Sequence, residues 1–175
     1  MGILKTGALM MALMSVGGIL SAQDVSTNNV ANKTDWSVFV EENPTECWGV
    51  ATPKESVNSR DGRVVAVNRG QTLLMVFYRP GAEAKGQVAF TGGYPFASGS
   101  TVNLNISGNE FEMFTEGEWA WPATPADDSK IVAAMKRGAD AIATGVSGRG
   151  TKTQDTFSLL GFTAAVEDAE KRCGG

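Results

Sequence analysis

The side chains available for chemistry in this sequence are mainly carboxylates, because the chain contains no histidine. The missing imidazole excludes Ser–His and Cys–His nucleophilic pairs and histidine metal sites. One stretch concentrates acidic residues, namely Glu110, Glu112, Glu116, Glu118, Asp127 and Asp128. Two of them could act as a glycosidase pair or bind calcium. However, Glu110 and Glu112 alternate with Phe111 and Met113, as on a solvated strand face, and no calcium-loop spacing is present. We therefore predict no catalytic residue, metal or cofactor.

Two tryptophans, Trp119 and Trp121, are the best candidates for a binding surface. They are two residues apart, so on a strand both rings point to the same side of the sheet. Paired aromatic rings form a stacking platform for sugars or apolar ligands. The alternative is that the rings cover the edge of the core or pack on a following helix, since large aromatic side chains are mostly buried.

A glycine-rich loop, residues 145–150, contains Arg149 and is followed by Lys152. The amides and cations of such a loop can hold a phosphate or a sulfated glycan, and lipopolysaccharide is one envelope ligand of that kind. The loop lacks the Gly-Lys-Ser/Thr of a P-loop and does not open a helix, which favours a plain hairpin turn. Together with Lys136 and Arg137, Arg149 and Lys152 are therefore candidates for a modest anionic-ligand patch.

The first 22 residues have the pattern of a secretory signal peptide. Lys5 precedes an apolar run over residues 7–20, and Ala22 offers a small residue for cleavage. The run is too short to span a membrane stably, so we expect no membrane span after its removal. An uncleaved anchor or a buried helix is the alternative. Cleavage near Ala22 predicts a periplasmic or secreted protein.

The predicted location outside the cytoplasm bears on the state of the two cysteines, Cys47 and Cys173. Exported proteins fold where thiols oxidise, so an isolated pair without C-x-x-C spacing indicates a disulfide bond rather than a metal or catalytic site. Two free thiols are the alternative.

The formal net charge of −4 disfavours a nucleic-acid partner, because phosphate binding needs a basic surface.

Strands are the elements that must position these residues. Residues 23–34 are polar and are predicted to be a flexible leader, and residues 35–175 are predicted to form a single domain. Alternating apolar residues and turn signals predict about nine strands, at 36–40, 46–51, 63–67, 72–78, 87–91, 101–106, 110–115, 139–146 and 153–160. Residues 52–62 are expected to be a polar loop, and the third and fourth strands a hairpin. This spacing is typical of an antiparallel β-sandwich.

Two helices complete the prediction. Thr124 is suited to cap a short internal helix, with Pro125 in its first position and acidic residues against its N-terminal dipole. A C-terminal helix is expected to follow a turn at Gly161. Its apolar residues recur at helical spacing and place the Cys173 thiol on the buried side; they are Phe162, Ala165, Val166, Ala169 and Cys173.

Three features resemble the invasion-associated locus B family of exported bacterial proteins: the early strand Asp35-Trp-Ser-Val-Phe, Cys47 shortly after it, and the ending Phe157-Ser-Leu-Leu-Gly-Phe-Thr-Ala-Ala followed by Cys173. The resemblance covers most of the chain after the signal peptide and rests mainly on that ending. It implies an all-β, sandwich-like domain in the periplasm or at the cell surface, linked in some pathogens to host-cell invasion, with no established catalytic residues or cofactor. Typical members carry a second cysteine pair, where this chain has Glu118-Trp-Ala-Trp-Pro. The chain therefore resembles a divergent branch.

These observations predict a non-enzymatic, exported binding protein of the cell envelope. Its expected partner is an envelope glycan, lipopolysaccharide or another envelope protein. Two alternatives stay open. The acidic residues beside paired tryptophans are compatible with a carboxylate-based hydrolase acting on envelope glycan, and the absence of a catalytic constellation is compatible with a structural or stress-protective periplasmic protein.

Overall fold

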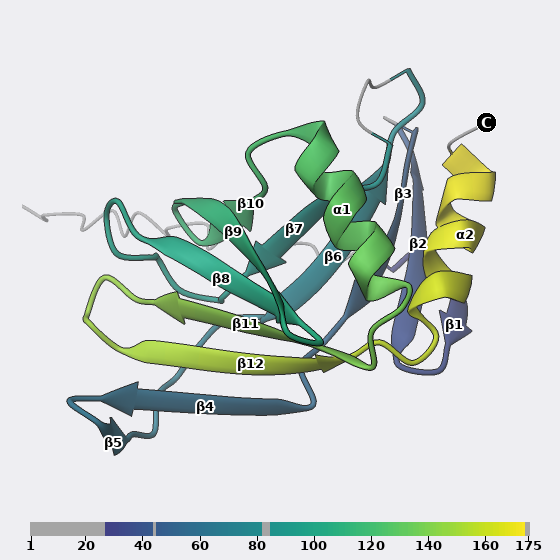
Figure 1. Ribbon diagram of the computed structural model, residues 1–175. Coiled ribbons are helices and arrows are strands. Elements are labelled where there is room, and N and C mark those ends of the chain that lie inside the picture. Colours follow the sequence, from purple (N-terminus) through teal and green to yellow (C-terminus); the bar gives the residue numbers. More distant parts are fainter. Residues whose placement is uncertain (1–26, 44, 82–84, 174–175) are drawn as a thin grey trace, which may run out of the picture.

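The computed structural model describes residues 27–43, 45–81 and 85–173 (Figure 1). The predicted signal peptide, residues 1–22, and the first part of the predicted leader lie outside these residues. Neither helix in the described part of the chain is long and apolar enough to cross a lipid bilayer.

Twelve strands form one sheet in which every neighbouring pair is antiparallel. In chain order they are β1 (Asn29–Lys33), β2 (Trp36–Glu42), β3 (Thr45–Ala51), β4 (Glu55–Arg60), β5 (Arg63–Val64), β6 (Leu73–Tyr78), β7 (Gln87–Thr91), β8 (Thr101–Ile106), β9 (Asn109–Glu116), β10 (Trp119–Trp121), β11 (Asp140–Val146) and β12 (Lys152–Ser158). Their order across the sheet is β1-β2-β3-β6-β7-β10-β9-β8-β11-β12-β4-β5. The prediction of a mainly β fold is confirmed.

The sheet bends over on itself and encloses the core between its two halves (Figure 1). Strands β7 and β12 are five places apart in the sheet order, yet Phe90 and Phe157 meet edge to face with ring centroids 6.1 Å apart. The indole Nε1 of Trp36 in β2 likewise donates to the carbonyl of Ser158 at the end of β12, at 2.9 Å. Two halves of one twisted sheet thus take the place of the two separate sheets of the predicted sandwich.

Helix α1 (Pro125–Met135) begins where the sequence predicts. Thr124 caps it, since its Oγ1 accepts a hydrogen bond from the amide of Asp127 at 3.2 Å. The helix lies against β7, and its Asp128 carboxylate accepts a hydrogen bond from the Val88 amide at 2.8 Å. Asp128 is therefore an anchor between helix and sheet as well as a favourable charge near the helix N-terminus.

Helix α2 (Phe162–Cys173) packs on β2 and β3, and Figure 1 shows it beside them at one end of the molecule. Its predicted apolar stripe is buried, as expected from the helical spacing. The turn before it needs Gly161, which has φ +90°. A Cβ there would lie 1.8 Å from the carbonyl oxygen of Lys33. The predicted turn at Gly161 is confirmed, and the close approach to β1 excludes any side chain at this position.

Part of the predicted leader is a strand. Residues 29–33 form β1, which pairs with β2 at the edge of the sheet, so the prediction of a flexible leader over residues 23–34 is wrong for this segment. Strand pairing uses backbone groups, so a polar segment can form an edge strand. Asn29 and Asn32 are exposed, Lys33 pairs with Asp168 of α2 at 3.1 Å, and Ala31 packs against the core.

The predicted loop at residues 52–62 and the predicted hairpin after it are also wrong. Residues 55–60 form β4, which pairs with β12, and β5 is only two residues long. Strand β6 pairs with β3 and β7 instead of β5. β4 lacks apolar alternation because its inner side chains join a polar network, described below. The connection 65–72 crosses from β5 to β6 and carries Arg69.

Candidate functional site

The two cysteines form the predicted disulfide bond. Cys47 in β3 and Cys173 at the end of α2 have their Cα atoms 5.7 Å apart, within the usual range for a bridge. Both residues are buried, and no free cysteine is present in the part of the chain that the structure describes. The bond ties the last helix to the sheet and leaves neither thiol for chemistry.

The two predicted tryptophans lie side by side on one face of β10. Trp119 and Trp121 have ring centroids 6.2 Å apart and planes inclined by 19°, and Trp121 also contacts Phe114 of β9 at 5.7 Å. Trp119 is 36% exposed and Phe114 is 47% exposed. We call Phe114, Trp121 and Trp119 the aromatic strip. Its rings face solvent in part and lie outside the core cluster.

A hollow of about 400 Å³ adjoins the aromatic strip where β10 leads into α1. Trp121 and Phe114 line it together with polar groups from Gln87, Glu116 and Asp128. Burial raises the pKa of the Asp128 carboxyl, against the opposing effect of the hydrogen bond from the Val88 amide. The hollow therefore combines aromatic surface with hydrogen-bonding groups, the usual composition of a small-molecule site.

The same face of the sheet carries a second row of rings. Phe39, Trp48 and Phe77 are in register across β2, β3 and β6, with centroids 5.5 and 5.9 Å apart along the row. Phe77 pairs in turn with Gln87 of β7, which lines the hollow. Registered residues share a face of a sheet, so this row and the aromatic strip lie on one side. Trp48, in the middle of this row, is only 9% exposed, whereas Trp119 and Phe114 are the exposed rings. We call these six rings the aromatic face.

The acidic residues are dispersed. Glu110 and Glu112 are exposed on β9, as predicted for a solvated face, Glu116 and Asp128 line the hollow, and Glu118 lines a different pocket. Within the described residues, no group of three or more Cys, Asp or Glu side chains is arranged to hold a metal ion. The acidic residues that are close together in the sequence between positions 110 and 128 therefore do not form a single site in the structure.

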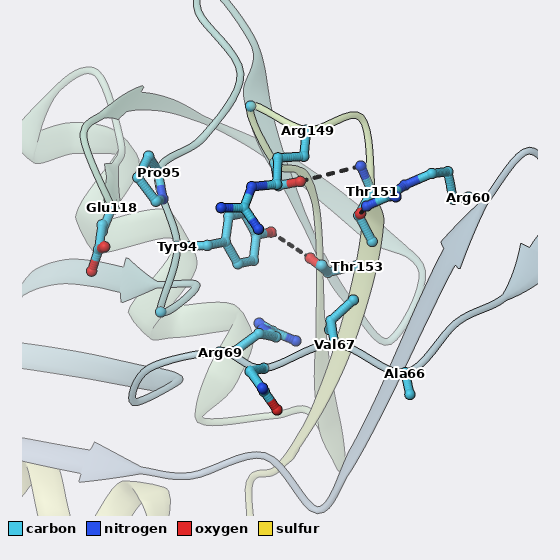
Figure 2. A pocket seen from close by; sticks show the side chains of 14 residues that line it. Arg60, Ala66, Val67, Arg69, Tyr94, Pro95, Glu118, Arg149, Thr151 and Thr153 are labelled. Atoms are coloured by element: carbon cyan, nitrogen blue, oxygen red, sulfur yellow. Dashed lines mark hydrogen bonds between the residues drawn. The ribbon is translucent and has the colours of Figure 1, made fainter.

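A second pocket, of about 560 Å³, is lined by three arginines (Figure 2). Arg60 comes from the end of β4, Arg69 from the connection 65–72 and Arg149 from the turn between β11 and β12. Tyr94, between Arg69 and the β11–β12 turn in Figure 2, contributes its ring, and Arg69 lies over that ring with its Cζ 5.1 Å from the centroid. Burial raises the Tyr94 pKa, so the phenol is neutral. We call this the arginine pocket.

Arg69 is fixed beneath the pocket by a buried ion pair. Its Nη1 and Nη2 atoms lie 2.8 and 2.7 Å from the two carboxylate oxygens of Asp155 in β12. The Asp155 side chain is 0% exposed and that of Arg69 10%. Arg69 also donates to the carbonyl of Gly92 and to Asn58, and Ser56 of β4 donates to Asp155 at 2.6 Å. This network explains why β4 carries polar residues on its inner side.

The structure separates the two cations predicted to act together. Strand pairing sets Lys152 opposite Ser59 and Thr153 opposite Asn58, so Lys152 points to the face away from the arginine pocket, which Arg149 and Thr153 line. The loop amides of Ser147, Gly148, Gly150 and Thr151 already donate within the protein. Amide binding of an anion by this loop is therefore not supported.

Sequence reasoning missed Arg60, Arg69 and Tyr94. Arg60 and Arg69 stood in segments that read as a loop and a turn, and no regular spacing connects either of them to residues 147–153. Strand pairing between β4 and β12 brings them together. The sequence held one signal for this site. In β4 the alternate residues Ser56, Asn58 and Arg60 all have hydrogen-bonding side chains, which is compatible with a strand that faces a polar network.

The chain was compared with known proteins. The model of the family described as Invasion associated locus B (IalB) protein matches residues 36–170. The crystal structure of invasion associated protein b from Bartonella henselae superposes with a TM-score of 0.56 at 16% identity, covering 81% of this chain and 95% of that one, which supports the shared fold. None of the curated proteins compared with the chain matches it. Because the family model spans most of the described fold, this chain belongs to the invasion-associated locus B family.

Proposed function

We propose that the protein is an exported, non-enzymatic binding protein of the cell envelope that holds a glycan chain on its aromatic face. The apolar run at residues 7–20 and the disulfide between Cys47 and Cys173 support export. The observation that carries the binding function is the aromatic strip, where Trp119 and Phe114 keep 36% and 47% of their surface exposed. Exposed, nearly parallel indole rings offer flat apolar surfaces to the faces of sugar rings.

The size of the aromatic face suits an extended ligand. It runs from β2 through β3, β6, β7 and β10 to β9, which is five strand spacings or roughly 24 Å along the sheet. Gln87 and Glu116 interrupt the rings with groups that can exchange hydrogen bonds with hydroxyls. A polymer with alternating apolar faces and hydroxyls matches this pattern better than the continuous apolar surface of a protein partner does.

The exposed rings of Trp119 and Phe114 also count against a purely structural protein without a ligand. Monomeric proteins rarely leave large side chains clustered at the surface, and such clusters usually mark a partner or a ligand. Arg79 reinforces the cluster, since its guanidinium lies 5.0 Å from the Phe77 centroid and donates to Gln87 at 2.6 Å. The side chains of this face are thus held in place before any ligand arrives.

Replacing both indoles, Trp119→Ala with Trp121→Ala, is expected to weaken glycan binding at least about tenfold, because each stacking contact contributes on the order of 1 kcal/mol. The measurement is a fluorescence titration with soluble, peptide-free glycan strands from peptidoglycan, together with cosedimentation with whole sacculi. Full binding by the double variant would remove the aromatic strip as the binding surface.

The matched control is Leu160→Ala. Leu160 is 63% exposed and follows β12, outside the aromatic face. Its replacement also deletes an exposed apolar side chain, so a loss of binding equal to that of the tryptophan variant would indicate nonspecific adhesion. Unchanged binding by this control, with loss in the double variant, supports the proposal.

One observation favours the hydrolase alternative enough to be tested. Asp128 has a raised pKa and lines the same hollow as Glu116 and Trp121, a combination that a glycosidase acid could use. Its carboxylate, however, is 5% exposed and already accepts the Val88 amide. We expect no release of reducing ends from peptidoglycan glycan strands. Release by the protein that disappears in Asp128→Asn would replace the binding proposal with an enzymatic one.

A further inference from the structure

We infer that the arginine pocket is a second ligand site, separate from the aromatic face, and that it binds a phosphate ester of a hydroxyl-rich molecule. The pocket lies where the end of β4, the connection 65–72, the loop containing Tyr94 and the β11–β12 turn converge. Its volume of about 560 Å³ is within the range of small-molecule sites.

The charge of the pocket is the first argument. The charged side chains that line it are Arg60, Arg69, Arg149 and Glu118. Arg69 is neutralised by Asp155, but no ion pair joins Arg60 or Arg149 to a carboxylate among the described residues. Two guanidinium groups therefore face one pocket with their charge uncompensated, in a chain whose net charge is −4. A local positive potential of this kind concentrates anions.

The rigidity of the pocket is the second argument. Four hydrogen bonds hold Arg69, and the Arg60 guanidinium donates to Thr151 Oγ1 at 2.6 Å. The amide of Gly70 donates to the carbonyl of Gly93 at 2.8 Å, so close that a Cβ at Gly93 would lie 2.5 Å from the carbonyl oxygen of Gly70. The parts of the wall formed by Arg60, Arg69 and the Gly70–Gly93 contact are therefore fixed before a ligand enters, which lowers the entropic cost of binding.

The geometry of the cations indicates the kind of anion. A single carboxylate is satisfied by one bidentate guanidinium, as Asp155 is by Arg69. Arg60 and Arg149 instead come from two different segments. Figure 2 shows the Arg60 side chain reaching to Thr151 and the Arg149 guanidinium in front of the Tyr94 ring. A phosphate monoester has three free oxygens and can accept hydrogen bonds from more than one guanidinium, which suits a pocket lined by both Arg60 and Arg149.

Glu118 indicates what carries the phosphate. Figure 2 shows its carboxylate beside Pro95, on the side of the pocket away from Arg60. A carboxylate there repels a second anion but accepts hydrogen bonds from hydroxyl groups. A phosphorylated sugar or another phosphorylated polyol, with its phosphate toward Arg60 and Arg149 and its hydroxyls toward Glu118, satisfies both ends of the pocket.

The test is isothermal titration calorimetry of the purified protein at low ionic strength with inorganic phosphate, glucose 1-phosphate and glucose. We expect saturable binding of glucose 1-phosphate, weaker binding of inorganic phosphate because it lacks hydroxyl contacts with Glu118, and none of glucose. Arg149→Gln is expected to weaken binding of glucose 1-phosphate at least about tenfold, the effect of losing a charge-assisted hydrogen bond. Arg149 has no protein partner among the described residues, so this variant should fold normally.

Lys152→Gln is the matched control, because it removes the same charge three residues away on the opposite face. We expect less than about a twofold change for it, since a solvated charge on the far face is screened. No binding of either phosphate compound by the protein overturns the inference, as does an equal loss in Lys152→Gln and Arg149→Gln.

A vesicle arm distinguishes the sources of the phosphate. Vesicles of phosphatidylglycerol and of phosphatidylcholine are compared by cosedimentation, with and without Arg149→Gln. Arg149-dependent retention on phosphatidylglycerol would assign a lipid headgroup, and binding of glucose 1-phosphate without retention would assign a soluble or glycan-borne phosphate. Trp119→Ala with Trp121→Ala should leave glucose 1-phosphate binding unchanged, so the fate of this site is separable from that of the aromatic face.

Discussion

Replacing both cysteines, Cys47→Ala with Cys173→Ala, is expected to lower the free energy of unfolding by roughly 4 to 5 kcal/mol. The bridge closes a loop over a sequence separation of 126 residues, and a loop of that length restricts the unfolded chain strongly. Both cysteines are buried, so their removal also leaves small cavities beneath α2. Most domains of this size have a total stability of only about 5 to 15 kcal/mol, so the loss would take a large part of it.

The measurement is chemical unfolding of the protein and of the double variant, with and without a reductant. The variant should unfold at a much lower urea concentration, and reductant should shift only the protein that has the bridge. A further check is mass spectrometry after alkylation, which should label both thiols only after reduction. If the free energy of unfolding of the variant is within about 0.5 kcal/mol of that of the unaltered protein, α2 docks without the covalent bond.

Replacing Asp155 by alanine is expected to cost about 3 to 5 kcal/mol, which is typical when one partner of a buried ion pair is removed. Arg69 would keep its charge at 10% side-chain exposure without the carboxylate that compensates it. The hydroxyl of Ser56 would lose its acceptor as well, so the pairing of β4 with β12 should loosen. The measurement is the urea midpoint, with hydrogen exchange of β4 amides as the local readout.

A double replacement separates charge from packing. Arg69→Met with Asp155→Leu removes both charges and keeps apolar bulk, so it should recover a substantial part of the loss seen for Asp155→Ala. The surface control is Lys130→Ala, whose side chain is 67% exposed and pairs with Asp127, and we expect a change below about 0.5 kcal/mol. An Asp155→Ala variant as stable as this control would contradict the assigned role of the buried pair.

The sequence predicts well those parts of the fold that depend on neighbours in the chain. The buried stripe of α2 follows from a period that repeats within the helix, and the cap at Thr124 and the turn at Gly161 are also local features. The orientation of Trp119 and Trp121 to one face follows from strand alternation alone. In each case the residues that determine the structure lie close together in the sequence.

The parts that were mispredicted depend on distant partners. Strand β4 is polar because Ser56 and Asn58 serve Arg69 and Asp155, and Ser56 and Asp155 are 99 residues apart in sequence. A strand whose inward side chains are polar lacks the alternation of apolar and polar residues that predicts a strand. Unless its buried polar partners are known, such a segment is predicted to be a loop. The arginine pocket and the second row of the aromatic face share this origin, because both require the strand register. Residue type alone does not reveal which strands will be neighbours.

The pairing of β4 with β12 also makes folding depend on a late segment of the chain. Strands β2, β3 and β6 pair with segments close to them in the sequence, whereas β4 has the nearby β5 on one side and the distant β12 on the other. Without β12, that side of β4 and the Arg69 guanidinium would lack their partners. The completed β12 closes the sheet around Asp155, and α2 then brings Cys173 to Cys47. A chain truncated before β12 would lack Asp155, Thr151 and Thr153, so the arginine pocket exists only in the complete sheet.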